Sequence, residues 1–168
     1  MANLELLLKA WDSAIWEFTL VFEGLSDDDL WRRPHPKLLS VGELAGHVAY
    51  WAAVQTTEPP IDRIKNIQEQ LSIKSPLLDP AFQYYSIEVD HTVVLDLTTE
   101  EVLNELKRVL EFSKSQVTRV DRSFDDKIIG RDDWTWGNLV EYQGFHAAYH
   151  AGQAYSVRHL LGHTTTDN

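Results

Sequence analysis

The sequence predicts an all-α protein, specifically a four-helix bundle, and three observations support that prediction. Apolar residues recur at helical spacing in four long stretches of the chain. Two of those stretches open with the residues of a capping box. No stretch has a convincing strand pattern, since residues 87–95 are the only candidate and stand alone. Four helices of this length, each with one apolar face, bury those faces by packing together.

The first helix is predicted from about residue 3 to Gly24, where glycine is a natural stop signal. The segment 25–31 then suggests a single helical turn, which Pro34 and Pro36 bring to an end. The apolar face of the first helix comprises Leu4, Leu7, Leu8, Trp11, Ile15, Phe18 and Phe22.

The second and third helices have the clearest starts. Ser40 as N-cap and Glu43 three residues later form one capping box, and this helix runs to about residue 57, before two prolines. Thr98 and Glu101 form the other capping box and open a helix that reaches about residue 120. The long, irregular connection between these two helices can carry the chain back along the bundle, which predicts an up-down-down-up order.

Within that connection, residues 61–71 are predicted as a short helix, and two prolines with an aromatic patch at 82–85 indicate an ordered loop. The fourth helix starts near Thr135 or Trp136 and ends by Gly162. Residues 1–163 therefore form one predicted domain, and residues 164–168 a disordered tail.

Composition limits the function. The chain of 168 residues has no cysteine, which excludes disulfides, thiolate metal sites and a cysteine nucleophile. A formal net charge of −11 without a large basic cluster predicts no nucleic-acid partner. No signal peptide and no apolar run of about 20 residues is found, so we expect a cytoplasmic protein without a membrane span.

His146 and His150 are the most informative residues, because they lie four positions apart on the apolar stripe of the fourth helix. Residues at this spacing are neighbours on one helix face, so two imidazoles there can converge on one metal ion. His47 lies on the flank of the inner face of the second helix and supplies a third candidate ligand. Three histidines leave a fourth position open for water or substrate. The alternative is that these are ordinary core histidines, hydrogen-bonded to tyrosine or carbonyl groups.

The other histidines lack this placement. His159 and His163 have the same spacing, but they lie on the outer face and Gly162 interrupts the helix between them. His35 and His91 lie in irregular segments without a partner at ligand spacing.

Three further residues are candidates to contact the metal ligands or a substrate. Tyr142 precedes His146 by one helical turn, Gln153 follows His150 by three residues, and Glu43 precedes His47 by one turn. A metal-bound histidine usually donates its other ring nitrogen to such a partner. Glu43 is already engaged by the capping box, so its role as orienting group or base is in question. No residue is assigned as catalytic.

In three segments the chain resembles the DinB-like (YfiT-type) family of metal-dependent four-helix-bundle proteins. Residues 25–34, LSDDDLWRRP, are similar to the family segment after helix one. Residues 40–47, SVGELAGH, resemble its capped second helix with the first metal histidine. The most specific element is His146-x-x-x-His150-x-Gly152-Gln153.

The resemblance implies that His47, His146 and His150 bind one divalent metal ion, zinc or nickel in relatives. It also implies thiol chemistry, because characterised relatives include bacillithiol S-transferases and mycothiol- or glutathione-dependent isomerases. Family members often form homodimers, which the Trp and Tyr content of this chain permits.

Three hypotheses follow. The leading one is a thiol S-transferase of the detoxification type, whose metal activates a small-molecule thiolate for attack on an electrophile. The alternative is a hydrolase that uses metal-bound hydroxide, for which no carboxylate clearly fits as base. The third is a non-catalytic bundle that binds metal or ligand in a stress response.

Overall fold

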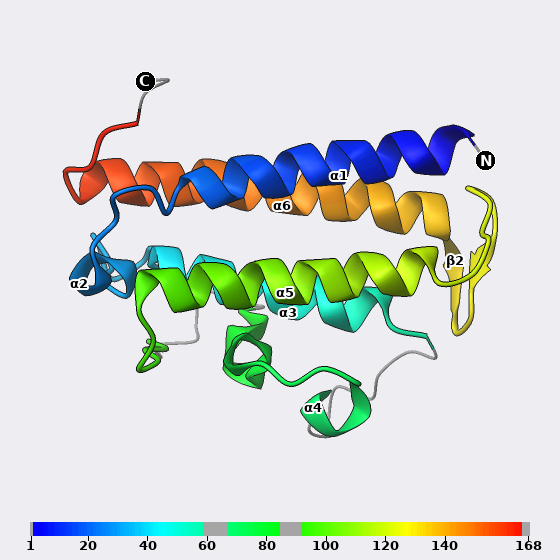
Figure 1. The fold of residues 1–168 in the computed structure, drawn as a ribbon, viewed down its shortest axis with the longest axis horizontal. Helices are drawn as coiled ribbons and strands as arrows, with labels where there is room; N and C mark the ends of the chain where they lie inside the picture. Colours follow the sequence, from blue (N-terminus) through cyan, green and yellow to red (C-terminus); the bar gives the residue numbers. More distant parts are fainter. Residues whose placement is uncertain (1, 59–66, 85–91, 166–168) are drawn as a thin grey trace.

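The computed structural model describes residues 2–58, 67–84 and 92–165, and they are mostly helical, which confirms the all-α prediction. Four of the described helices have 16 to 25 residues, and Figure 1 shows the shorter pieces between them. The helices, 3-10 turns and strands are, in order, α1 (Ala2–Leu20), α2 (Asp27–Leu30), α3 (Val41–Thr56), α4 (Ile67–Gln70), η1 (Pro76–Leu78), η2 (Pro80–Gln83), α5 (Thr99–Thr118), β1 (Lys127–Ile128), β2 (Arg131–Thr135) and α6 (Trp136–Leu160).

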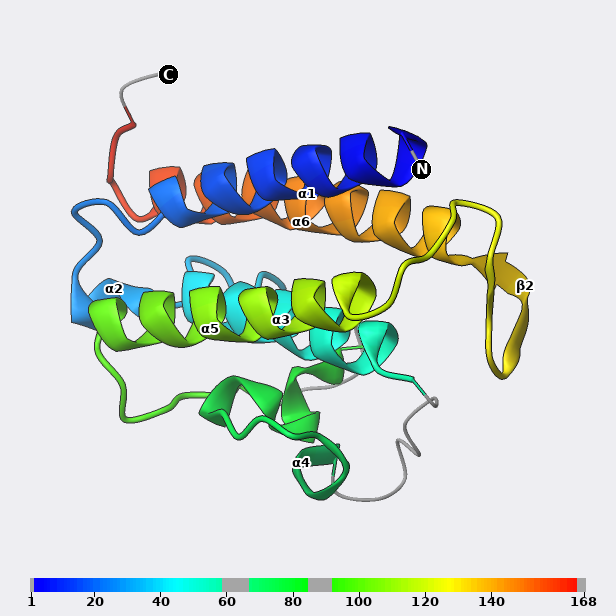
Figure 2. The same cartoon turned by 45° about the vertical axis from the view of Figure 1, so that its right-hand side comes forward.

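The long helices lie in two pairs. α1 packs chiefly against α6, and α3 packs against both α5 and α6. Figures 1 and 2 show the pairs side by side, and the colour order shows α1 and α6 running one way while α3 and α5 run the other. Because α3 contacts α6, side chains from these two helices can meet between the pairs.

Capping explains where the long helices begin. Ser40 Oγ accepts from the Glu43 N–H at 3.2 Å, and the Glu43 carboxylate accepts from the Ser40 N–H at 2.8 Å. Thr98 and Glu101 make the same reciprocal pair at α5, so both predicted capping boxes are confirmed. A third box, between Thr135 and Asn138, opens α6. Each box satisfies backbone N–H groups that have no partner within the helix.

Several predicted boundaries need correction. α1 ends at Leu20, four residues before Gly24, which adopts φ +67° in the turn that follows. Of the helix predicted over 61–71, α4 occupies only Ile67–Gln70, and residues 61–66 lie outside the described residues. The strand candidate at 87–95 is not a strand in its described part, 92–95, and its remainder is not described. In the predicted tail, residues 164 and 165 are non-helical and 166–168 are not described.

A small hairpin that the sequence pattern does not predict precedes α6. β1 and β2 pair antiparallel around Gly130, which has φ +76°. Strands of two and five residues are too short and too polar for a period-two apolar pattern. The loop before the hairpin positions the start of α6, since the Gly137 N–H donates to the Phe124 carbonyl at 2.9 Å.

α3 is the most deeply buried helix. Every residue from Val41 to Val54 is buried, because α5, α6 and the two 3-10 turns surround the helix. Its polar residues therefore need partners inside the protein. Among the helices of the described residues, none combines the length and the apolar character that a bilayer span requires.

Candidate metal centre

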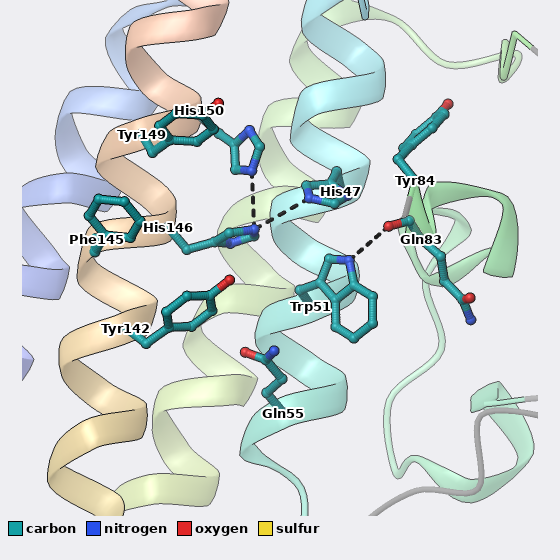
Figure 3. A pocket seen from close by; sticks show the side chains of 10 residues that line it. All are labelled: His47, Trp51, Gln55, Gln83, Tyr84, Tyr142, Phe145, His146, Tyr149 and His150. Carbon is teal, nitrogen blue, oxygen red and sulfur yellow. Dashed lines mark hydrogen bonds between the residues drawn. The ribbon is translucent and has the colours of Figure 1, made fainter. Parts of the chain in front are cut away.

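Three histidine rings meet between α3 and α6. Figure 3 shows His47 pointing from α3 toward His146 and His150 of α6. The Nε2 atom of His146 lies 3.3 Å from Nε2 of His47 and 3.1 Å from Nε2 of His150. One ligand atom from each of the three lies within 4.8 Å of the others. The structure thus brings together the three histidines that the sequence singled out.

Hydrogen bonds at the far side of two rings fix which nitrogen carries the proton. His47 Nδ1 lies 2.9 Å from the Phe82 carbonyl oxygen, and His150 Nδ1 lies 2.7 Å from Oε1 of Gln153. Both oxygens only accept, so each Nδ1 carries the proton and each Nε2 keeps a lone pair. Two lone pairs therefore point into the cluster.

Burial keeps the rings neutral. The three residues are only 7–8% exposed. The pKa of His146 is lowered to about 3, mainly by burial and to a smaller extent by the two neighbouring imidazoles. Burial likewise lowers the pKa of His150 to about 4, and it lowers the pKa of His47. Neutral imidazole is the form that binds a metal ion.

The donor set fits a divalent metal ion. Zn–N bonds of about 2.0–2.1 Å at tetrahedral angles place two ligand nitrogens about 3.3 Å apart, close to the separations of 3.1 and 3.3 Å found here. The Nε2 atoms of His47 and His150 carry no proton, and Nε2 of His146 can carry only one. The three neighbouring nitrogens therefore have more lone pairs than N–H donors among them. A bound cation satisfies all three, and imidazole suits zinc and nickel.

The main chain of residues 82 and 83 binds two side chains of α3, His47 and Trp51. The carbonyl oxygen of Phe82 accepts from His47, and that of Gln83 accepts from Trp51 Nε1 at 3.0 Å. The Phe82 ring lies against Gly46 so closely that a Cβ there would overlap it. Glycine before His47 therefore lets the η2 turn approach α3 and orient the imidazole. Sequence patterns could not reveal main-chain carbonyls as partners.

Of the residues predicted to support the ligands, Gln153 and Tyr142 contact them. Gln153 accepts from His150, and its own amide N–H donates to Tyr149 at 3.1 Å. Tyr142 stacks on the His146 ring, with centroids 5.7 Å apart and planes 22° from parallel. Its contact is therefore packing on the ring rather than a hydrogen bond to it. His146 Nδ1 is buried and has no hydrogen-bond partner among the described residues.

Glu43 has other partners. Its fully buried carboxylate pairs with Arg33 at 2.6 Å and accepts from the Ser40 and Val93 N–H groups and the Tyr84 hydroxyl. Burial by itself raises the pKa of Glu43, but the hydrogen bonds from Arg33 and the backbone outweigh it, so the net shift is downward. Glu43 thus joins the start of α3 to the segment after η2, and Tyr84 also lines the metal pocket.

The remaining histidines do not gather into a second cluster in the described part of the chain. His159 Nε2 lies 3.2 Å from the Thr165 hydroxyl, and His163 Nε2 lies 2.8 Å from the Asp29 carboxylate. His35 Nδ1 accepts from the Lys37 N–H in its own loop. His91 lies outside the described residues.

A pocket of about 330 Å³ opens onto the three histidines. Besides the three histidines, five of its lining side chains are Trp, Tyr or Phe and two are glutamine amides. Tyr149 lies beside His150, with ring centroids 5.0 Å apart. The lining comprises His47, Trp51, Gln55, Gln83, Tyr84, Tyr142, Phe145, His146, Tyr149 and His150.

A mostly helical fold with three buried, convergent histidines defines a class of helical proteins that can bind a metal ion. A family model described as the DinB superfamily matches residues 10–154, so the chain belongs to that superfamily. The matched segment contains all three histidines. Comparison with curated proteins and with solved structures gave no match.

Proposed function

We propose that this protein is a metal-dependent thiol S-transferase of the detoxification type, with one zinc or nickel ion bound by His47, His146 and His150. The observation that carries the proposal is the convergence of three neutral imidazoles on an aromatic pocket. The membership of the DinB superfamily supports the metal-binding part. The thiol and the electrophile are proposed to be small molecules, since the pocket is near the lower end of the size range for ligand sites.

The ligand set suits an anionic metal ligand, and a thiolate is one such ligand. When bound, a divalent metal supplies Lewis acidity that lowers the pKa of a coordinated thiol. Three neutral histidines leave the double positive charge uncompensated, so the pocket attracts an anion such as a thiolate. Gln153 and the Phe82 carbonyl hold two of the imidazoles in the productive tautomer. Aromatic side chains line the space beside these imidazoles.

Hydrolysis is less well supported. A hydrolase needs a base near the attacking water, and no carboxylate is among the described residues that line the pocket. Glu43, the nearest candidate from the sequence, is bound to Arg33 and to two backbone N–H groups. Thiol transfer has no such requirement, because the thiolate is itself the nucleophile.

We also propose the fold topology, the cellular location and the oligomeric state that the sequence predicts. Residues 1–163 are taken as one up-down-down-up four-helix bundle in the cytoplasm, and a homodimer remains a prediction. The net charge of −11 supports the expectation of no nucleic-acid partner.

Metal analysis and a thiol-transfer assay test the proposal. The purified protein, repleted with Zn²⁺ or Ni²⁺, is expected to hold one ion per chain. It should then accelerate saturable consumption of bacillithiol, mycothiol or glutathione by monochlorobimane. His150→Ala should abolish both results, and His159→Ala should change neither. Ester turnover without thiol would favour the hydrolase, and metal binding without turnover would favour a non-catalytic protein. Absence of stoichiometric metal would overturn the site itself.

A further inference from the structure

The pocket beside the three histidines contains a fixed amide group. Gln143, only 2% exposed on α6, donates its side-chain N–H to Oε1 of Gln55 on α3 at 2.5 Å. That bond uses the Gln55 oxygen and so turns its Nε2 away from Gln143. In Figure 3 the Gln55 amide lies below Trp51 and Tyr142, with its nitrogen on the side of Trp51. Among the described residues, Gln55 Nε2 has no hydrogen-bond partner, so its N–H groups are available to a ligand.

A second donor lies on the opposite side of the same pocket. Tyr142 stacks on His146, and this contact fixes its ring. Its hydroxyl points into the pocket in Figure 3 and makes no hydrogen bond to another described residue. The rings of Trp134 and Phe145 pack against Tyr142 at 5.6 and 6.3 Å between centroids, so its position is supported from several directions. Two preplaced donors thus flank the space next to the metal ligands.

Apart from the histidines and the Gln83 amide, the rest of the lining is aromatic, and none of these side chains is an acid, a lysine or an arginine. Trp51, Tyr84, Phe145 and Tyr149 present ring faces or edges to the pocket. No lysine, arginine, aspartate or glutamate is among its described lining residues. A ligand charge placed at this wall would have no partner and would lose its hydration. Flat, apolar groups instead gain from burial against aromatic rings.

We propose that Gln55 and Tyr142 form a binding subsite for an uncharged, flat electrophile that carries a carbonyl-type hydrogen-bond acceptor. The inference rests on the proposed function, because it names the class of the electrophile in that reaction. The Gln55 N–H and the Tyr142 O–H donate to the acceptor, and the aromatic rings bury the apolar body. The reacting carbon is thereby held beside the three histidines, where the thiol is activated.

The surroundings of the subsite favour an uncharged ligand. An anionic electrophile would compete with the thiol for the metal and would find no cationic side chain at the described wall. A cationic one would gain from the aromatic faces, but it would lie close to a divalent cation and be repelled by it. A neutral acceptor avoids both costs.

Binding of four small probes tests the subsite independently of turnover. Acetophenone has a ring and an acceptor, ethylbenzene has the ring alone, benzoate is anionic and phenyltrimethylammonium is cationic. Saturation-transfer NMR titrations on the Zn²⁺-loaded protein should give the tightest binding for acetophenone. Its dissociation constant is expected to be about five- to tenfold lower than that of ethylbenzene, the effect of one or two net hydrogen bonds. Equal binding of these two, or tighter binding of either charged probe, would overturn the proposal.

Variants assign the preference to the two residues. Gln55→Glu can still accept from Gln143 but no longer donates, and Tyr142→Phe keeps the ring and loses only the hydroxyl. Each should remove most of the preference for acetophenone over ethylbenzene while leaving ethylbenzene binding unchanged. Gln116→Leu, on α5 outside the pocket lining, is the matched control and should bind like the parent protein. Retention of the full preference in both pocket variants would contradict the assignment.

A metal-free titration separates this inference from the proposed function. If acetophenone binds through Gln55 and Tyr142, its preference over ethylbenzene persists after the metal is removed. If the carbonyl instead binds the metal directly, the preference disappears with the metal and the subsite is disproved. A protein that shows the preference but transfers no thiol would keep the subsite and lose the transferase proposal.

Discussion

Two histidine pairs with the same four-residue spacing lie in the last third of the chain, and their surroundings differ. His146 and His150 are buried on α6, face a third histidine from α3, and have nitrogens 3.1 Å apart. His159 and His163 lie where α6 ends: Gly162 adopts φ +93°, and His163 is beyond the last helical residue. The two rings of that pair turn to different partners, Thr165 and Asp29. Two histidines four residues apart therefore form part of a metal site only where the helix continues through both and a neighbouring helix supplies a further ligand.

Removing one histidine from each pair should give the largest contrast. His146→Ala takes away the central ligand, which lies next to both other Nε2 atoms. Zn²⁺ affinity should fall by more than about 100-fold, beyond the effect of losing a partner of a ligand. His163→Ala should leave it unchanged. Competition titration against a chelating dye measures both constants, and similar losses in the two variants would refute the difference between the pairs.

Acid should destabilise the protein through the buried pair. Their pKa values, lowered to about 3 and about 4, mean that the unfolded chain binds more protons than the folded one below pH 6.5. The stability of the metal-free protein is thus retained above that pH and is lost as the pH falls toward 4. The loss should be about 2 kcal/mol per histidine by pH 5.

Urea unfolding at pH 7, 6 and 5 checks this dependence. The double variant His146→Gln/His150→Gln should flatten the pH profile in that window, and His159→Gln should leave it as in the parent protein. A steep profile that survives in the double variant would show that other groups cause it.

The partners of the two pairs should also differ in importance. Gln153→Leu removes the acceptor that fixes the His150 tautomer. The loss of such an orienting group typically costs ten- to a hundredfold in metal affinity, and we expect about that here. Thr165→Ala, which removes the hydroxyl next to His159, should have no effect. Calorimetric titration with Zn²⁺ compares the two, and an unaffected Gln153→Leu protein would remove Gln153 from the site.

The smallest expected effect concerns the approach of the third histidine. Gly46→Ala places a methyl group into the Phe82 ring, which should cost about 1–3 kcal/mol of stability by overpacking and shift the carbonyl that orients His47. Gly152→Ala, between the two histidine pairs on α6, meets nothing within 4 Å and should stabilise the helix by up to about 1 kcal/mol. Urea unfolding should therefore show a lower free energy of unfolding for Gly46→Ala and a higher one for Gly152→Ala. An unchanged free energy of unfolding in Gly46→Ala would show that the η2 turn can move aside without loss of stability.

Much of this organisation was predictable from local sequence. The capping boxes at Ser40 and Thr98 are local hydrogen-bond patterns, so the starts of α3 and α5 followed directly from residue type. The hairpin of β1 and β2 was not predictable in the same way, since its strands are too short to establish a period. The end of α1 was also predicted wrongly. The helix ends at Leu20, and Gly24 belongs to the turn that follows it.

The sequence by itself determined which residues can form the site, because helical spacing put His146 and His150 on an apolar stripe and His47 on the flank of an inner face. Only the tertiary structure decided how they act together. The packing of α3 against α6 sets the Nε2 separations, and the η2 turn supplies the carbonyl that orients His47. Gln55 and Gln143, 88 residues apart, become partners in the same way. Periodicity reports the face of a single helix, whereas distances between helices depend on how all the side chains between them pack.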